Sequence, residues 1–325
     1  MRTQLLDIDA STYRPHPLHS GERVWTETNC YVDLWIELLH ALGLEPLAAA
    51  AFTLRTDFEG DQWTFFKFPL EDLWALYGID VYEMNAWQPI EHHIVEQLEL
   101  GRLLTVEVDS WYLPDTAGVS YQLDHVKSSI VPNGIDPDRR ELAYFHNAGY
   151  FELAGDDYDG VLRRTPELSD PRFLPPYVEL VNLDALRHDD AATLRENATS
   201  LTRAHLGRRP STNPVLRMRK RLAGDVAWLA TQSLDTFHQW AFGFCRQCGA
   251  NAELAAAFVD WLAAGDTPAL AASVDAFREM ANEAKTLQFS LARAARGRAV
   301  DVEPILDALE HHWDAAMAPL VAHYD

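Results

Sequence analysis

The stretch that decides the expected fold is TNCYVDLWIELLHALG, residues 28–43. Its apolar residues leave almost no polar face, so the pattern predicts one helix inside the domain. Thr28 or Asn29 is a suitable N-cap residue, and Gly43 follows the last turn. Cys30 would then lie in the first turn, where free N–H groups and the helix dipole stabilise a thiolate.

The position of Cys30 permits two interpretations. Most free cysteines are small buried apolar side chains, whereas papain-like enzymes hold their nucleophile at the start of a buried helix. A cysteine nucleophile also needs a base and a group that orients the base. His125 is the best base, because it opens an expected strand flanked by polar residues. Asn147 or Asp109 would accept a hydrogen bond from the second ring nitrogen.

Composition excludes several classes of function. The 325-residue chain has 27 basic and 49 acidic residues and a formal net charge of −22, which argues against nucleic acid or an anionic membrane as a partner. The first residues lack an apolar core long enough for a signal peptide, and no later run would span a bilayer. Three cysteines do not form a disulfide framework. We therefore expect a cytoplasmic protein.

Strand and helix signals predict an α+β domain in the first half of the chain, with a mainly antiparallel sheet. Residues 102–109 form the strongest strand pattern, and residues 62–68 alternate aromatic and polar side chains. Asn133-Gly134 is a hairpin signal between expected strands at 124–131 and 142–146.

The composition changes near residue 165, where prolines accumulate. From about residue 190 the chain is rich in alanine and leucine with helical periodicity. We expect a catalytic domain over 1–165 and a helical domain over 166–325, with helices near 190–206, 214–248, 251–264, 268–297 and 302–320.

The middle of the first domain carries a resemblance. GRLLTVEVDSWYLP at residues 101–114, followed by Tyr121 and His125, resembles the N-terminal domain family of butirosin biosynthesis protein H. The helix that begins at Asn29-Cys30 matches that family too. YFHNAGY at residues 144–150 is similar to a bacterial branch of it. The resemblance covers roughly residues 25–155.

That resemblance implies a papain-like, cysteine-peptidase-type fold with Cys30 as nucleophile and His125 as base. Asn147 stands where an aspartate is commoner, and no glutamine lies about six residues before Cys30 to donate to an oxyanion. The Cys30 N–H and the side chain of Asn29 or Thr28 would fill that role. Asp109 and Tyr112 are further candidates for oxyanion or substrate contacts near the mouth of the site.

The family's namesake moves an aminoacyl group from an acyl-carrier-protein thioester to an aminoglycoside amine. The resemblance therefore implies a biosynthetic acyltransferase of secondary metabolism with a small amine acceptor. It would need no cofactor of its own, since the phosphopantetheine belongs to the carrier protein. A hydrolase on the same site (peptidase, amidase or thioesterase) and a non-catalytic binding module are the alternatives.

Two features lie in the helical half. Residues 203–221 contain seven basic residues and no Asp or Glu. Such a segment would bind an acidic carrier protein, with Arg203, Arg217, Arg219 and Arg221 as contacts, or would be a salt-bridged helix face. Cys245 and Cys248 form a lone CxxC pair, which we expect to be packed thiols without a metal.

Overall fold

The chain, in this computed structural model, is described over residues 2–21, 23–165, 174–264 and 268–324. It forms two compact units. Unit 1 contains Met1–Gly21, Asn29–Pro46 and Leu70–Asp189, and unit 2 contains Glu22–Thr28, Leu47–Pro69 and Asp190–Asp325. The expected boundary at residue 165 is therefore too early. Strand β7 (Val178–Asn182) still belongs to the sheet of unit 1, and two segments before residue 70 join the helical unit.

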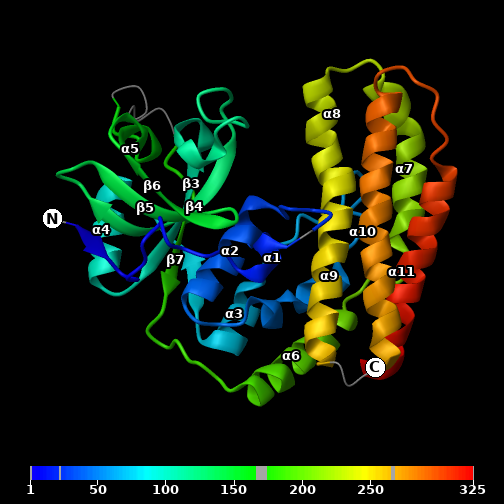
Figure 1. Ribbon diagram of the computed structural model, residues 1–325, viewed down its shortest axis with the longest axis horizontal. Helices are drawn as coiled ribbons and strands as arrows, with labels where there is room; N and C mark the ends of the chain where they lie inside the picture. Colours follow the sequence, from blue (N-terminus) through cyan, green and yellow to red (C-terminus); the bar gives the residue numbers. More distant parts are fainter. Residues whose placement is uncertain (1, 22, 166–173, 265–267, 325) are drawn as a thin grey trace. The chain divides into compact units, whose positions relative to one another are not determined.

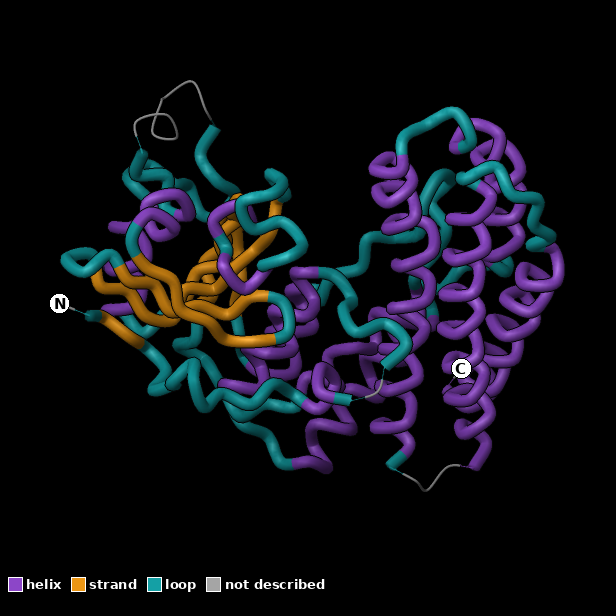
Figure 2. The backbone as a smooth tube through the Cα atoms, turned by 45° about the horizontal axis from the view of Figure 1, so that its top comes forward, coloured by secondary structure: helices purple, strands orange, loops and turns teal. Residues whose placement is uncertain are grey.

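The described part of unit 1 contains a seven-stranded sheet in the order β2-β7-β3-β4-β5-β6, with β1 paired to β4. Every pairing is antiparallel, so the predicted α+β class and sheet type are confirmed (Figure 2, orange). The other strands are β1 (Thr3–Gln4), β2 (Asp80–Glu83), β3 (Leu103–Asp109), β4 (Lys127–Asp136), β5 (Glu141–His146) and β6 (Gly149–Ala154).

Helix α2 (Cys30–Ala41) is the predicted buried helix. Its N-cap is Asn29, whose Oδ1 accepts from the Val32 N–H at 3.0 Å. It packs against β4, β5 and β6 (Figure 1). The remaining helices of unit 1 are α1 (Pro17–Ser20), α3 (Leu70–Tyr77), α4 (Ile90–Glu99) and α5 (Asp156–Val161), with 3₁₀ turns η2 (Ser110–Tyr112) and η3 (Pro114–Thr116).

The hairpin predicted at Asn133-Gly134 is wrong, because both residues lie inside β4. Asn133 is fully buried, and its side-chain amide exchanges hydrogen bonds with the backbone of Leu6 at 2.7 and 2.9 Å. Gly134 pairs with Gln4 of β1, where a side chain on residue 134 would crowd the Gln4 side chain. A partner distant in sequence therefore outweighs the local turn preference.

Residues 62–68 do not form the predicted strand. The described backbone there makes one isolated bridge, between Phe58 and Trp63. Phe66 and Phe68 are buried against Phe52, with ring centroids 5.9 and 5.2 Å apart. Phe66 and Phe68 therefore pack in a core and do not belong to a ladder of paired strands.

Unit 2 is helical, as predicted. It contains the 3₁₀ segment η1 (Pro46–Arg55, from its second residue), α6 (Ala191–Leu206), α7 (Pro214–Leu229), α8 (Leu234–Ala241), the π-helical turn η4 (Phe242–Arg246), α9 (Gln247–Ala263), α10 (Pro268–Ala294) and α11 (Glu303–Tyr324). α10 packs along both α9 and α11 (Figure 1). The single helix expected over 214–248 is interrupted, and Ser233 caps α8 by accepting from the Thr236 N–H at 3.1 Å.

Among the helices of the described ranges, none combines the length and the apolar composition that a membrane crossing requires.

Candidate active site around Cys30

Cys30 is the first residue of α2, and its side chain is partly exposed. Ser128 and Ser129, both on β4, lie beside the thiol, and hydrogen bonds from the Ser128 hydroxyl and the Ser129 backbone act to lower its pKa. The charges that act on it are the carboxylate of Asp33, one turn further along α2, and the ammonium of Lys127. The sheet therefore supplies the immediate partners of the thiol.

A buried hydrogen-bonded chain continues from Ser128. Ser128 Oγ lies 2.7 Å from His146 Nε2, and His146 Nδ1 lies 2.5 Å from Asp115 Oδ2. The His146 and Asp115 side chains are only 1% and 4% exposed. Tyr144 donates to the other Asp115 oxygen at 2.5 Å. We call Ser128, His146 and Asp115 the relay.

The chemistry of the relay fixes its polarity. A carboxylate only accepts, so Asp115 accepts a hydrogen bond from Nδ1 of His146, and this leaves Nε2 facing Ser128 Oγ. While Cys30 is a thiol, Ser128 donates to Nε2 and its oxygen can accept from Sγ. When Cys30 is a thiolate, Ser128 donates to Sγ, and this is the bond that lowers the pKa of Cys30. Burial and the Asp115 charge raise the pKa of Tyr144 far above its ordinary value, so its hydroxyl remains a donor. A proton therefore has a continuous path from Sγ to the imidazole.

The thiolate expected at Cys30 from its position in the helix is not supported. Burial raises the pKa of the Cys30 thiol, and the Asp33 carboxylate acts in the same direction. The hydrogen bonds from Ser128 and Ser129 and the Lys127 charge lower the pKa. Their combined effect is smaller than the increase, so the net pKa is raised. The group at rest is a thiol that needs a base.

Cys30 is expected to react with iodoacetamide faster than Cys245 or Cys248, which are 1% and 2% exposed. Because its pKa is raised, its rate should climb with pH to a midpoint above about 8.5, the ordinary value for cysteine. Timed alkylation with peptide mapping measures both. The slowest reaction at Cys30, or a midpoint below neutral pH, would contradict this expectation.

His125, the predicted base, lies just before β4. Its Nδ1 is 2.6 Å from Asp109 Oδ2, and its ring stacks on Trp111 with centroids 4.5 Å apart. The side chain is 66% exposed, and within the described ranges no hydrogen bond joins it to Cys30. Of the two alternatives for its orienting partner, the structure selects Asp109.

Asn147 is not the orienting residue. It sits in the tight turn between β5 and β6 with φ +44°, a left-handed conformation that asparagine tolerates. Asn29 uses its side-chain oxygen to cap α2. The Tyr112 ring packs directly against Gly160, where an added Cβ would fall 2.1 Å from the ring. Glycine at 160 permits this close approach.

The relay residues were missed by sequence reasoning. The sequence pattern singles out none of Ser128, His146 and Asp115 as a site residue. The available signal was their position on neighbouring strands, since Ile130 pairs with His146 and Ser128 is two residues away on the same face. Asp115 follows the YLP segment, but nothing local indicates its contact with β5.

The basic segment of α7 is largely neutralised within unit 2. Arg217 pairs with Asp57, and Arg221 pairs with Asp225 at 2.7 Å. Arg219 pairs with Asp307, and its other nitrogens lie 3.7 and 3.5 Å from Glu303 and Glu310. Three of the four arginines assigned to carrier binding therefore form a salt-bridged helix face, which was the alternative interpretation.

Cys245 and Cys248 are buried, in η4 and at the start of α9, and burial raises the pKa of both thiols. Helix α9 continues through Gly249. The Trp25 indole would lie 2.2 Å from a Cβ at that position. In the ranges that the structure describes, no group of three or more His, Cys, Asp or Glu side chains is arranged to hold a metal.

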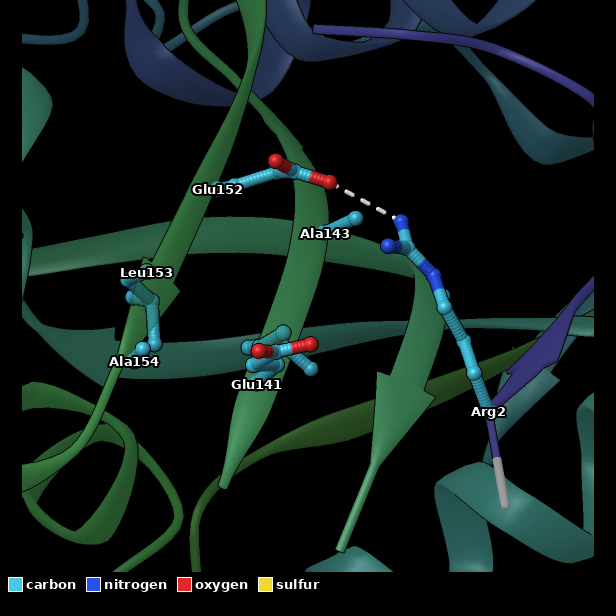
Figure 3. A pocket seen from close by; sticks show the side chains of 8 residues that line it. Arg2, Glu141, Ala143, Glu152, Leu153 and Ala154 are labelled. Atoms are coloured by element: carbon cyan, nitrogen blue, oxygen red, sulfur yellow. Dashed lines mark hydrogen bonds and ion pairs between the residues drawn. The ribbon is translucent and has the colours of Figure 1, made fainter. Parts of the chain in front are cut away.

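A pocket of about 280 Å³ lies elsewhere in unit 1, over β5 and β6 (Figure 3). Arg2 reaches across it to Glu152 at 2.9 Å. Its lining contains no cysteine or histidine among the described residues. Its described lining therefore offers no cysteine–histidine pair, so the relay beside Cys30 is the better candidate for cysteine chemistry.

Two family models match the chain. The DUF1839 N-terminal domain matches residues 14–183, and the DUF1839 C-terminal domain matches residues 191–322. The first match contains Cys30 and the whole relay. The interval between the two matches agrees with the boundary between units near residue 190. Among curated proteins, none matches the sequence.

Proposed function

The chain belongs to the DUF1839 family, and we propose that it is a cysteine-dependent acyltransferase with Cys30 as its nucleophile. The observation that carries the proposal is the buried hydrogen-bonded chain of Ser128, His146 and Asp115 beside the thiol, whose pKa Ser128 influences. Nucleophile, base and orienting carboxylate are the three parts that covalent acyl transfer needs.

In the first half-reaction, Sγ attacks the carbonyl carbon of a donor thioester. The Sγ proton passes to Ser128 Oγ while the Ser128 hydroxyl proton passes to His146 Nε2. The carbon–sulfur bond of the donor then breaks, and its sulfur takes the proton back from the imidazolium through Ser128. The products are a free donor thiol and an acyl group on Cys30.

In the second half-reaction an amine attacks that acyl carbon, and its proton reaches His146 by the same route. The bond to Sγ breaks, and Sγ recovers the proton. The products are an amide and the original thiol. Because the pKa of Cys30 is raised, the resting group is mainly the thiol, and the attack needs His146 to accept its proton.

The resemblance to the butirosin-type family supports a carrier-bound thioester as donor and a small amine as acceptor. A carrier protein would dock away from Arg217, Arg219 and Arg221, because carboxylates of unit 2 already pair with them. The same chemistry with water in the second step would make the protein a hydrolase, so the test must separate the two.

The test is intact-protein mass spectrometry after incubation with acyl and aminoacyl pantetheine thioesters. The wild type should gain one acyl group, mapped to Cys30. Cys30→Ala should gain none, Ser128→Ala should gain it more slowly, and Cys248→Ser serves as the matched control that keeps it. Added small amines should discharge the adduct to amides.

Two results would overturn the proposal. One is an equal adduct on Cys30→Ala. The other is the absence of any adduct from the whole thioester set in protein whose Cys30 still alkylates. Discharge at the same rate with and without amine would assign the hydrolase instead.

A further inference from the structure

A second buried cluster lies against the nucleophile helix, on the N-terminal segment of unit 1. His19, from α1, places Nε2 3.1 Å from Asp33 Oδ1, and its Nδ1 bonds to Glu37 Oε1. All three side chains are 0% exposed. An imidazole thus bridges two carboxylates that are about one turn apart on α2.

This cluster shares a helix face with the thiol. Cys30, Asp33 and Glu37 stand at i, i+3 and i+7, a spacing that aligns side chains along one side of a helix. The Asp33 charge acts on Cys30 and raises the pKa of its thiol. Whatever neutralises Asp33 therefore acts on the nucleophile.

His19 is charged at neutral pH. Burial lowers its pKa, but the hydrogen bonds and charges of Asp33 and Glu37 outweigh that effect and raise it to about 9. Glu37 has further donors, the Tyr13 hydroxyl at 2.5 Å and the His16 N–H at 3.0 Å. Both of these donors are neutral, so His19 is the cation among the described partners of Glu37.

We propose that His19 is a positioning residue for Cys30: its imidazolium holds the Asp33 carboxylate and cancels much of the negative charge that this carboxylate presents to the thiol. The catalytic meaning of this role rests on the proposed function, since Cys30 must ionise as it attacks. The electrostatic effect itself does not.

The other titratable groups around these residues are few. Lys127, on β4, acts on Cys30 with the opposite sign to Asp33. His16 lies on the same segment as His19, and burial, with His40 acting in the same direction, lowers its pKa to about 4, so it is neutral. His146, on β5, reaches the thiol through Ser128. Among these groups, only His19 is an imidazolium in contact with Asp33.

The experiment measures the rate of Cys30 alkylation by iodoacetamide against pH in the full chain. His19→Gln should raise the midpoint by about 1 pH unit, because it leaves the Asp33 charge uncompensated and a neighbouring charge shifts a pKa by roughly 1–3 units. Asp33→Asn should lower the midpoint, and adding it to His19→Gln should cancel the increase. His188→Gln is the matched control: it changes an exposed histidine bound at 2.9 Å to the Leu42 carbonyl, beyond the far end of α2.

An unchanged midpoint in folded His19→Gln would overturn the inference. Should that variant fail to fold by circular dichroism, Asp33→Asn decides, and an unchanged or raised midpoint in it overturns the inference. Alkylation needs no acyl donor. A shifted midpoint without any acyl adduct would therefore reject the proposed function and leave the role of His19 in place.

Discussion

His146→Ala is expected to reduce kcat/KM for acyl transfer to an amine by roughly 10²–10⁴-fold, the contribution of a positioned general base. The imidazole is the acceptor at the end of the path from Cys30 through Ser128, and the raised pKa of the thiol makes that acceptor necessary. Asp115→Asn should cost a comparable factor, because an amide can donate to Nδ1 and favour the wrong tautomer.

His125→Ala is the matched comparison. It removes another histidine–aspartate pair of unit 1, with Asp109, which is solvent-exposed and has no hydrogen bond to Cys30 in the described structure. Its effect should be much smaller. Circular dichroism and Cys30 alkylation would show that both variants are folded. Loss of transfer in His125→Ala with retention in His146→Ala would return the role of base to His125.

The free energy of unfolding is expected to fall by about 3 kcal/mol as pH rises from 6.5 to about 9, with His19 as the source. The pKa of His19 is higher in the folded protein than in the unfolded chain. Its stabilisation is therefore fully present below pH 6.5 and is lost as pH rises through the folded value.

Other groups act mostly outside this window. The lowered pKa of His16, about 4, costs stability only as pH falls below 6.5. The raised pKa values of the cysteines also lower the free energy of unfolding as pH rises. They do so only near and above pH 8.5, because the ordinary pKa of a thiol is about 8.5. Urea unfolding at pH 6, 7, 8 and 9 would measure the dependence. His19→Gln should be less stable and should flatten the curve between pH 6.5 and 8, whereas His188→Gln should not.

A flat or rising stability for the wild type between pH 6.5 and 8 would contradict the buried imidazolium. It would also remove the charge on which the electrostatic role of His19 depends. The unfolding experiment and the alkylation experiment therefore test the same group through different observables.

Local sequence determined the parts of this protein that depend on neighbours along the chain. The helix that begins at Cys30 follows from a predominantly apolar run with Asn29 able to cap it. β3 follows from a dense β-branched and leucine pattern, and the helical half follows from its alanine and leucine periodicity. In each case the hydrogen bonds or packing faces are set within a few residues.

Tertiary structure decided what depends on partners far apart in the chain. Asn133 became part of a strand because Leu6 completes its hydrogen bonds, and β7 returned to the sheet between β2 and β3. The choice between histidines followed the same rule. His125 and His146 both stand at strand ends, and only the contacts between β4, β5 and η3 join His146 to Ser128 and Asp115. The charge of His19 likewise exists because α1 lies against Asp33 and Glu37, a proximity that no spacing in the sequence encodes.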